Sequence, residues 1–281
     1  MRTWIWIINW CLSILTITGN GVIIFLVFSK RQLRTKTNAF LVSLAVADFL
    51  IGTTTVPFFY FCEISKSCKG NVIWQFVVIF TRFSLCYASM MNLCSVVLDR
   101  FIAVVIPFAY LSFMTRRPVV CIISLAWVIA IGQLIFPMAG LVFSKPVFIR
   151  IHSIIVATFY EFLPCVTLVF CVGSMVRVVF NHKRAANTLA KQLRFNHEVF
   201  LKSQDSSTVK TTAIIVGFTL VCYSILMRCS MIYLVYSAKK CEDDDYKIPI
   251  LISNSALNPL AYAFLKRDIK RAFKELTKSA F

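Results

Sequence analysis

The strongest constraint on this chain is a series of seven long apolar blocks separated by short polar segments. A helix needs about 20 apolar residues to cross the hydrocarbon core of a bilayer, which is about 30 Å thick. Charged residues make up 15% of the chain and hydrophobic residues 59%, whereas about a quarter of a soluble domain is charged. We therefore predict an all-α membrane protein, a seven-transmembrane helix bundle with spans Trp4 to Phe28, Asn38 to Phe61, Trp74 to Ile106, Pro118 to Val142, Ser153 to Val179, Thr211 to Tyr236 and Ile248 to Phe264.

The distribution of basic residues predicts the orientation of the bundle, because short cytoplasmic loops are enriched in lysine and arginine. With the amino terminus outside, the inner segments contain 19 lysines and arginines and the outer segments contain 8. We therefore expect a multi-pass protein of the plasma membrane with an extracellular amino terminus and a cytoplasmic carboxyl terminus. The cations are scattered over separate loops, which excludes a nucleic-acid partner and favours the lipid bilayer as partner.

The residues after the seventh block predict a short amphipathic helix on the inner membrane surface. Apolar residues recur there at helical spacing, and basic residues occupy the other face. The apolar set is Leu265, Ile269, Ala272, Phe273 and Leu276, and the basic set is Lys266, Arg267, Lys270, Arg271 and Lys274. A solvated, fraying tail is the alternative. The chain thus divides into a seven-transmembrane domain over residues 1–264 and a surface helix with a short tail over residues 265–281.

Ionisable residues inside the apolar blocks are costly in lipid and mark functional sites or polar cavities. Asp48 lies in the middle of the second block, Asn254, Ser255 and Asn258 share one face of the seventh, and Ser89 of the third can complete the set. One carboxylate among several neutral oxygens is a ligand set that a hard monovalent cation accepts. A hydrated hydrogen-bond cluster without an ion is the alternative. In either case these side chains should face one another across the bundle.

Two arginines of the third block require partners. Arg100 lies beside Asp99 near the inner end, where it can reach an acid on a neighbouring helix, such as Asp205. Arg82 lies about eight residues from the outer end, which is about 12 Å deep at about 1.5 Å per residue. An unpaired guanidinium at that depth is costly, so Arg82 should meet either Glu161 of the fifth block or an anionic group of a ligand. Both alternatives stay open.

Six short motifs, in order along almost the whole chain, resemble those of the rhodopsin-like (class A) family of G-protein-coupled receptors. One such motif is weak, but six in register are very specific. They do not identify a subfamily. The motifs are Gly19-Asn20, Leu44-Ala45-Val46-Ala47-Asp48, Asp99-Arg100-Phe101 in place of the family's Asp-Arg-Tyr, Trp127, Pro164 and Asn258-Pro259-Leu260-Ala261-Tyr262.

The resemblance implies a receptor rather than an enzyme, which binds an extracellular ligand and activates heterotrimeric G proteins when the inner end of its sixth helix moves outward. It assigns the coupling and activation switch to Asp99, Arg100, Asp205, Tyr223, Asn258, Pro259 and Tyr262. It assigns an allosteric sodium ion, the only cofactor expected, to a polar core of Asp48, Ser89, Asn254, Ser255 and Asn258. For the ligand pocket we expect Arg82, Glu161 and Tyr223.

Two spans depart from the family pattern at positions that matter for activation. The sixth has Thr219-Leu220-Val221-Cys222-Tyr223-Ser224-Ile225 where the family usually has Phe-x-x-Cys-Trp-x-Pro. Without the proline, this helix keeps a backbone hydrogen bond and loses its usual cause of kinking. Val172 replaces the usual inward tyrosine of the fifth helix. Coupling is therefore expected to be weak or unusual, and a non-coupling decoy or scavenging receptor is an alternative.

The outer end departs from the family as well. Gln75 replaces the cysteine that usually begins the third helix, and the loop from Ser144 to His152 has no cysteine to pair with one. The outer cysteines are Cys62, Cys68 and Cys241, and an oxidising compartment allows a bridge between two of them. Their connectivity stays open, because it depends on geometry.

The ligand is unknown, but two classes are disfavoured. Amine receptors of the family have an aspartate where this chain has Arg82, and opsins have a lysine where it has Ile252. A simple amine and retinal are thus both disfavoured. A channel or transporter is a further alternative, but it predicts broken helices, repeat symmetry or polar residues along the whole depth, and the sequence shows none.

Overall fold

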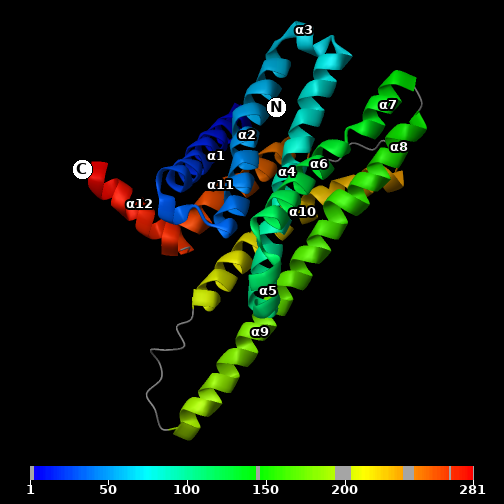
Figure 1. Ribbon diagram of the computed structural model, residues 1–281. Coiled ribbons are helices and arrows are strands. Elements are labelled where there is room, and N and C mark those ends of the chain that lie inside the picture. Colours follow the sequence, from blue (N-terminus) through cyan, green and yellow to red (C-terminus); the bar gives the residue numbers. More distant parts are fainter. Residues whose placement is uncertain (1–2, 144–145, 194–203, 237–243, 266, 281) are drawn as a thin grey trace.

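The computed structural model describes residues 3–143, 146–193, 204–236, 244–265 and 267–280, and all regular structure within these ranges is helical (Figure 1). The long helices form one bundle, with α3 at one end and α5 at the other; we call these the α3 end and the α5 end. In chain order the elements are α1 (Thr3–Ser29), η1 (Arg31–Leu33), α2 (Lys36–Ile64), α3 (Lys66–Lys69), α4 (Val72–Val105), α5 (Pro107–Phe113), α6 (Arg116–Gly132), α7 (Ile135–Phe143), α8 (Pro146–Ile155), the π-helix η2 (Val156–Phe162), α9 (Leu163–Leu193), α10 (Gln204–Tyr236), α11 (Asp244–Leu265) and α12 (Arg267–Ala280).

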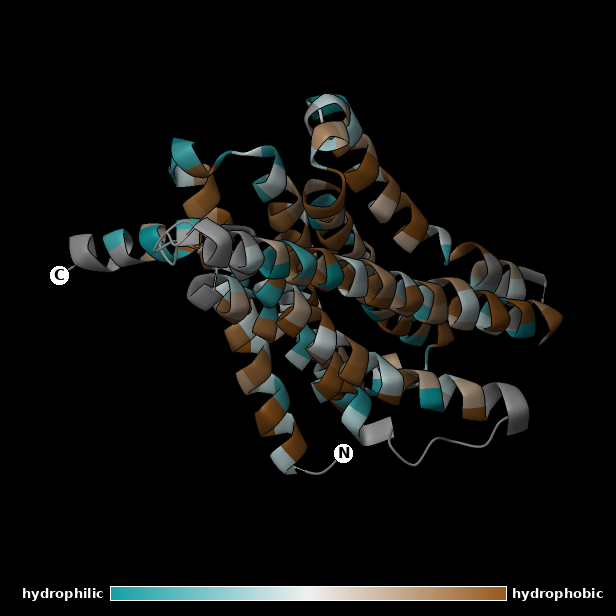
Figure 2. Cartoon of the chain, turned by 90° about the horizontal axis from the view of Figure 1, so that it is seen from below, coloured by the Kyte–Doolittle hydropathy of each residue, from teal (hydrophilic) through white to brown (hydrophobic). Residues whose placement is uncertain are grey.

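Six helical segments of the described part are long and apolar enough to cross a bilayer, and they coincide with the first six apolar blocks. Their hydrophobic residues form long stretches along the helices (Figure 2). Helix α11 covers the seventh block and lies against α1 and α10. The six segments are Thr3–Ser29, Lys36–Ile64, Val72–Val105, Arg116–Gly140, Arg150–Ala185 and Val209–Ile232.

Three helix boundaries lie seven or more residues outside the predicted ones, among them the start of α10 at Gln204 instead of Thr211. The predicted fourth span is also divided by a turn into α6 and α7. The fifth span was expected to begin at Ser153 after a loop from Ser144, but α8 already begins at Pro146. Proline suits the first turn of a helix, and the helix can continue beyond the hydrocarbon core. At its other end α9 continues to Leu193, well past Val179, because residues such as Ala185 support a helix in water without being apolar enough to predict a span.

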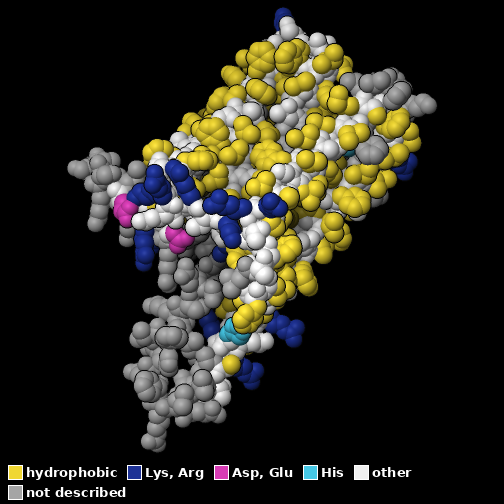
Figure 3. Space-filling model, viewed as in Figure 1, with side chains coloured by type: hydrophobic (Ala, Val, Ile, Leu, Met, Phe, Trp, Pro, Cys, Tyr) yellow, Lys and Arg dark blue, Asp and Glu magenta, His cyan; other side chains and the backbone are white. Residues whose placement is uncertain are grey.

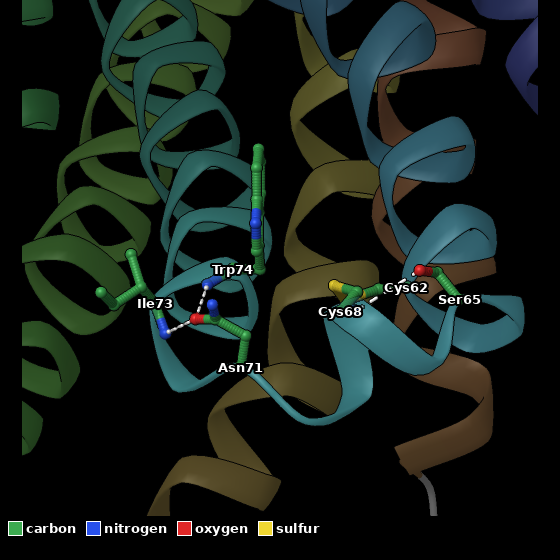
Figure 4. The surroundings of a disulfide bond; sticks show 6 residues. All are labelled: Cys62, Ser65, Cys68, Asn71, Ile73 and Trp74. Carbon is green, nitrogen blue, oxygen red and sulfur yellow. Dashed lines mark hydrogen bonds between the residues drawn. A yellow bond between two sulfur atoms is a disulfide. The ribbon is translucent and has the colours of Figure 1, made fainter.

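Polar side chains set the helix ends at the α3 end. Asn71 accepts hydrogen bonds from the backbone N–H groups of Ile73 (2.9 Å) and Trp74 (3.3 Å), which caps α4 (Figure 4). A disulfide joins Cys62, in the last turn of α2, to Cys68 in α3, with 5.0 Å between their Cα atoms. Cys62 and Cys68 are therefore the pair among the three outer cysteines, and Cys241 lies outside the described residues.

The bundle has an apolar outside and a partly polar inside. Large hydrophobic side chains such as Phe28 and Val128 are 60% and 66% exposed, and hydrophobic side chains cover most of the face in Figure 3. Lipid solvates such side chains, whereas polar groups must find partners within the protein. The buried polar set includes Asn9, Ser13, Thr16, Asn20, Asp48, Ser89, Asn92, Thr219, Asn254, Ser255 and Asn258.

Helix α12 packs one apolar face on the bundle. Ile269 and Ala272, two of the residues predicted to form this face, are buried in the same core cluster as residues of α1 and α2. Lys30, after α1, forms an ion pair with Glu275 of α12. The predicted helix is thus present, and its position on a membrane surface stays a prediction.

Candidate functional site

Asp48 lies at the centre of a buried polar core. Its side chain is fully buried in α2, and each carboxylate oxygen accepts a hydrogen bond from another helix. Ser89 Oγ of α4 donates to Oδ1 at 2.6 Å, and Asn258 Nδ2 of α11 donates to Oδ2 at 2.8 Å. The structure therefore brings together these predicted residues across the bundle.

The polar core continues into α1 and α10. Asn20 Nδ2 donates to the carbonyl oxygen of Ser255 at 3.2 Å, which joins α1 to α11. Thr219 Oγ1 donates to Asn254 Oδ1 at 2.9 Å, which joins α10 to α11. Ser255 is buried in the same region. Polar side chains thus join five of the long helices in this region, in part directly and in part through α11.

The donor set of this core fits a monovalent cation. Asp48 provides one negative charge, and Ser89, Ser255 and Asn254 provide neutral hydroxyl and amide oxygens. Hard cations prefer such oxygen ligands. Within the described residues no group of three or more histidine, cysteine or acidic side chains is placed to hold a metal, so the core does not resemble a multivalent-metal site.

At the α5 end of α4, Arg100 is enclosed by hydrogen bonds. Its Nε donates to Asp99 Oδ2 at 3.0 Å, and its Nη2 contacts both Asp99 and the hydroxyl of Thr37 in α2. Tyr110 of α5 donates its hydroxyl to Asp99 Oδ1 at 3.0 Å. We call Asp99, Arg100, Thr37 and Tyr110 the arginine cluster. The side chain of Asp205, its other predicted member, lies outside the described residues.

The two tyrosines assigned to the activation switch are both buried. Tyr223 of α10 donates its hydroxyl to the carbonyl oxygen of Cys86 in α4 at 3.3 Å. Tyr262 of α11 is 5% exposed, and its hydroxyl has no hydrogen-bond partner among the described residues. Pro259 packs so closely on α1 that a Cβ atom at Gly19 would lie 3.0 Å from it.

The predicted pocket residues Arg82 and Glu161 have different neighbours. The Arg82 guanidinium carbon lies 5.1 Å from the ring centroid of Phe83 and 5.8 Å from that of Phe59. Glu161 Oε1 accepts a hydrogen bond from Ser230 Oγ of α10 at 3.0 Å, while its Oε2 is buried with no partner in the described part of the chain. Ser230, rather than Arg82, is thus the hydrogen-bond donor to Glu161.

A π-helix places Glu161. The i to i+5 bonding of η2 (Val156–Phe162) widens the turn, and such bulges are frequent at functional sites. Tyr160 and Glu161, adjacent in sequence, are consequently both buried. Tyr160 donates to the carbonyl oxygen of Ile129 in α6 at 2.6 Å, and its ring centroid lies 5.1 Å from that of Tyr87 in α4.

The sequence interpretation missed two sets of polar contacts. Thr37 and Tyr110 of the arginine cluster lie at helix starts or in a connection, where no pattern marked them. The second set joins three helices: Trp127 Nε1 donates to Ser43 Oγ at 3.0 Å, and Ser43 donates to Asn92 Oδ1 at 2.7 Å. Asn92 was detectable, because an asparagine inside an apolar block needs a partner.

A helical bundle with an apolar outside and one buried carboxylate in its polar core defines a multi-pass membrane protein. The model of the family described as 7 transmembrane receptor (rhodopsin family) matches residues 19–262, and the chain belongs to this family. The family fold is a seven-helix bundle, which makes α11 the seventh span. The resemblance drawn from the six motifs is thereby confirmed, and membership of a receptor family confirms that the chain is not an enzyme.

Several similar proteins are receptors. The chain is 27% identical to the alpha-1A adrenergic receptor of Oryzias latipes over 92% of the chain and 63% of that receptor. It is 29% identical to the histamine H2 receptor of Cavia porcellus, over 94% of the chain and 77% of that receptor. It is 26% identical to the adenosine receptor A2b of Bos taurus, over 94% and 86%. The names of these receptors do not support the prediction that a simple amine is a disfavoured ligand of this chain. That prediction stays untested.

Proposed function

We propose that this chain is a cell-surface receptor that binds an extracellular ligand at the α3 end and activates heterotrimeric G proteins at the α5 end. The amino terminus is then extracellular and the carboxyl terminus cytoplasmic, as the excess of basic residues in the inner segments predicts. The arginine cluster is the observation on which this proposal rests. A buried acid, an arginine and two hydroxyl groups from three elements form a closed arrangement that a partner protein can open.

Activation in this proposal releases Arg100. In the closed arrangement Asp99 and Thr37 occupy its guanidinium, so it cannot reach a partner. Outward movement of the α5 end of α10 opens the bundle there, and Arg100 extends toward the G protein. Tyr262, whose hydroxyl has no partner here, then swings inward and finds one. A buried hydroxyl without a hydrogen bond favours such a rearrangement, because its desolvation is uncompensated.

The polar core transmits the change between the two ends. Thr219 belongs to α10, and its hydrogen bond to Asn254 links the moving helix to α11, whose Asn258 donates to the Asp48 carboxylate. A sodium ion held by Asp48, with oxygens of Ser89, Asn254 and Ser255, would favour the closed state by fixing α2, α4 and α11 together. Asn258 belongs to the same core through its bond to Asp48.

The ligand pocket lies toward the α3 end and involves Arg82, Glu161 and Tyr223. An anionic ligand group would lie against Arg82, and the buried Glu161 oxygen without a partner offers an acceptor for a donor or cationic group. Tyr223 forms the floor between α4 and α10 through its bond to the Cys86 carbonyl. Changes of ligand contact at this floor move α10.

The decisive experiment is a G-protein activation assay with small-molecule and peptide libraries on the parent chain and on Arg82→Ala. Arg228→Ala, which removes another arginine of the α3 half, is the matched control. We expect at least one ligand whose response Arg82→Ala reduces and Arg228→Ala retains. Ligands that bind without G-protein activation would instead support the decoy alternative. Responses that all survive Arg82→Ala would remove Arg82 from the pocket.

A further inference from the structure

Two buried polar side chains in the α3 half of the bundle have no hydrogen-bond partner among the described residues. Asn9 of α1 is 0% exposed, and both polar atoms of its side-chain amide are unpaired there. Thr55 of α2 is 3% exposed, and its hydroxyl is unpaired within the same described part of the chain. A bundle surrounded by lipid has to satisfy such groups internally, because each one left unpaired is costly. Both side chains therefore need a partner that the described protein atoms do not supply.

The contact between α1 and α2 places these two side chains close together. Ser13 Oγ of α1 donates to the Gly52 carbonyl oxygen of α2 at 2.6 Å, which fixes the register of the two helices. The helices run in opposite directions, so the turn before Ser13 lies beside the turn after Gly52 (Figure 1). Asn9 lies one turn before Ser13 on the same face of α1, and Thr55 lies one turn after Gly52 on the same face of α2. The amide and the hydroxyl thus belong to one region between the helices.

The rest of this region is apolar. Val56 and Ile252 are fully buried in one hydrophobic cluster, and Trp6 and Phe59 pack against it. The ring centroids of Trp6 and Phe59 lie 5.6 Å apart, one turn beyond the two polar side chains toward the α3 end. These neighbours cover the amide and the hydroxyl, but aliphatic and ring carbon atoms cannot replace their hydrogen bonds.

The region is separate from the polar core around Asp48. Gly52 packs so closely on α1 that an added Cβ atom would lie 2.9 Å from Ile17 Cγ1 and 3.3 Å from the Ile17 backbone nitrogen. This contact lies between the two polar regions, because Asp48 and Thr55 lie one turn of α2 on either side of Gly52. The Asp48 carboxylate also has its own hydrogen-bond donors on α4 and α11. The candidate sodium ligands therefore belong to a different site.

The occupant of the region has to be small, neutral and able both to donate and to accept hydrogen bonds. An amide has an N–H donor and an oxygen acceptor, and a hydroxyl can act as either. An ion would need a countercharge, which neither side chain carries. Water meets all these requirements, and a buried water typically forms about three hydrogen bonds to polar groups that otherwise lack partners.

We propose that a buried water molecule bridges α1 and α2 by accepting a hydrogen bond from Asn9 Nδ2 and donating one to Thr55 Oγ1. The bridge gives α1 a second polar attachment to α2, one turn from the direct hydrogen bond between Ser13 and Gly52. It holds the α3 half of α1 on the bundle. This water site does not depend on ligand binding or on G-protein coupling.

The energetic test is a double-variant cycle on the purified full chain, with Asn9→Leu, Thr55→Val and both changes together. Each single variant breaks the bridge and leaves the other polar group with fewer partners, so each should lower the melting temperature by about 2 to 4 °C. The double variant removes both polar groups and should melt no lower than the less stable single variant. Single variants that both raise the melting temperature would show two unsatisfied groups without water and would overturn the bridge. Losses that simply add in the double variant would overturn it as well.

Thr54→Val is the matched control. The Thr54 hydroxyl already donates to the Leu50 carbonyl oxygen of its own helix at 2.7 Å, so it needs no water. Combined with Asn9→Leu, this change should be additive. Coupling to Asn9 as strong as that of Thr55→Val would indicate a general loosening of α2 and would overturn the assignment to Thr55.

A cryo-electron microscopy map of the full chain at a resolution that shows waters is the direct test, and it needs no variant. We expect density between the Asn9 amide and the Thr55 hydroxyl, and no such density in a map of Thr55→Val. Density that stays in Thr55→Val would assign the water to Asn9 alone and overturn the bridge. A direct contact between the two side chains without density would also overturn it. Because neither measurement uses a ligand or a G protein, the result is independent of the proposed signalling.

Discussion

Tyr110 is the residue whose chemistry most directly affects the arginine cluster. It reaches Asp99 from α5, outside the long helices, and its hydroxyl is also 3.4 Å from that of Thr37. Burial raises the pKa of Tyr110 above its ordinary value of 10.0, so the phenol stays protonated at neutral pH and donates to the carboxylate. The donor is thus permanent under physiological conditions, and its removal requires either movement of α5 or competition from another acceptor.

Tyr110→Phe should raise ligand-independent G-protein activation. The change removes one hydrogen bond to a charged acceptor, worth about 1.5 to 3 kcal/mol when buried and less in this half-exposed connection, so we expect a rise of about three- to tenfold. Nucleotide exchange at equal surface expression is the measurement. Ser112→Ala is the control, since Ser112 donates to the carbonyl oxygen of Ala109 in its own helix. Basal exchange that stays at the parent level would separate Tyr110 from the closed state.

Among single residues, the sequence predicted those whose side chain is polar within an apolar block. Asp48, Ser89 and Asn258 are polar inside apolar blocks, and the structure places them in contact. Thr37 and Tyr110 are ordinary residues near helix ends, and only the packing of α2 and α5 against α4 gives them Arg100 and Asp99 as partners. The same reason explains Ser230, which became a neighbour of Glu161 through the π-helix η2.

At the scale of elements, α1 and α2 approach closely because Gly52 has no side chain. Ser13 Oγ donates to the Gly52 carbonyl oxygen at 2.6 Å. A Cβ atom at Gly52 would lie 2.9 Å from Ile17 Cγ1 and 3.2 Å from the Ser13 carbonyl oxygen. Small residues at helix contacts are a general means of close packing in membranes, where van der Waals contact replaces the hydrophobic effect between helices.

Gly52→Ala should therefore lower the melting temperature of the purified chain. Overpacking costs about 1 to 3 kcal/mol, which exceeds the gain of about 1 kcal/mol in helix propensity, since backbone atoms of α1 would have to move. Gly173→Ala in α9 is the matched control, because no atom lies within 4 Å of its added Cβ and only the propensity gain remains. Equal melting temperatures for the two variants would show that α1 can shift freely.

The contact between α12 and α1 should depend on pH through Glu275. The hydrogen bond and charge of Lys30 lower the pKa of Glu275 below its ordinary value of 4.5. Because the pKa of Glu275 is lower in the folded state, its ion pair with Lys30 stabilises the folded state fully above pH 4.5. This stabilisation is lost as the pH falls through the lowered pKa of Glu275. Intrinsic-rate-corrected hydrogen exchange of α12 should therefore be faster at pH 3 than at pH 7.

Glu275→Gln should give fast exchange of α12 at pH 7 and a smaller change on acidification. Asp268→Asn, which removes another acid of α12 while leaving the Lys30 pair intact, should keep the parent's pH dependence. The effect is small because the pair is exposed to solvent and to salt. A pH dependence that Glu275→Gln leaves unaltered would show that the apolar face alone holds α12.

The order of the long apolar spans was predictable, because an apolar block of this length is satisfied by crossing lipid. The turn that divides the fourth block into α6 and α7 was not predictable. The helix boundaries were only partly predictable. The start of α8 at Pro146 and the end of α9 at Leu193 lie in polar sequence, where a helix is allowed but not required by the solvent. The π-helix η2 was not predictable, since its extra residue per turn depends on the packing of Tyr160 and Glu161 against neighbouring helices.

At the scale of the whole molecule, the polar core and the arginine cluster lie in series along one axis from the pocket to the α5 end. The polar core joins α1, α2, α4, α10 and α11, and a movement of α10 is resisted there by the hydrogen bond from Thr219 to Asn254 of α11. The missing proline leaves α10 continuous from Gln204 to Tyr236 in the structure. In the proposed function such a continuous helix would move as one rod, which would link the floor of the pocket to the G-protein end without a flexible joint.

Asp48 provides the final test, because its charge has only neutral hydrogen-bond partners. If a sodium ion completes this core, sodium chloride should raise the melting temperature of the parent more than choline chloride at the same ionic strength. Each tenfold rise in sodium above its dissociation constant adds about 1.4 kcal/mol, or about 3 to 5 °C for a protein of this size. Asp48→Asn keeps the shape and removes the charge, so its melting temperature should respond equally to both salts. Equal responses of the parent to sodium and choline would instead indicate a hydrated core without an ion. The alternative left open by the sequence would then be the correct one.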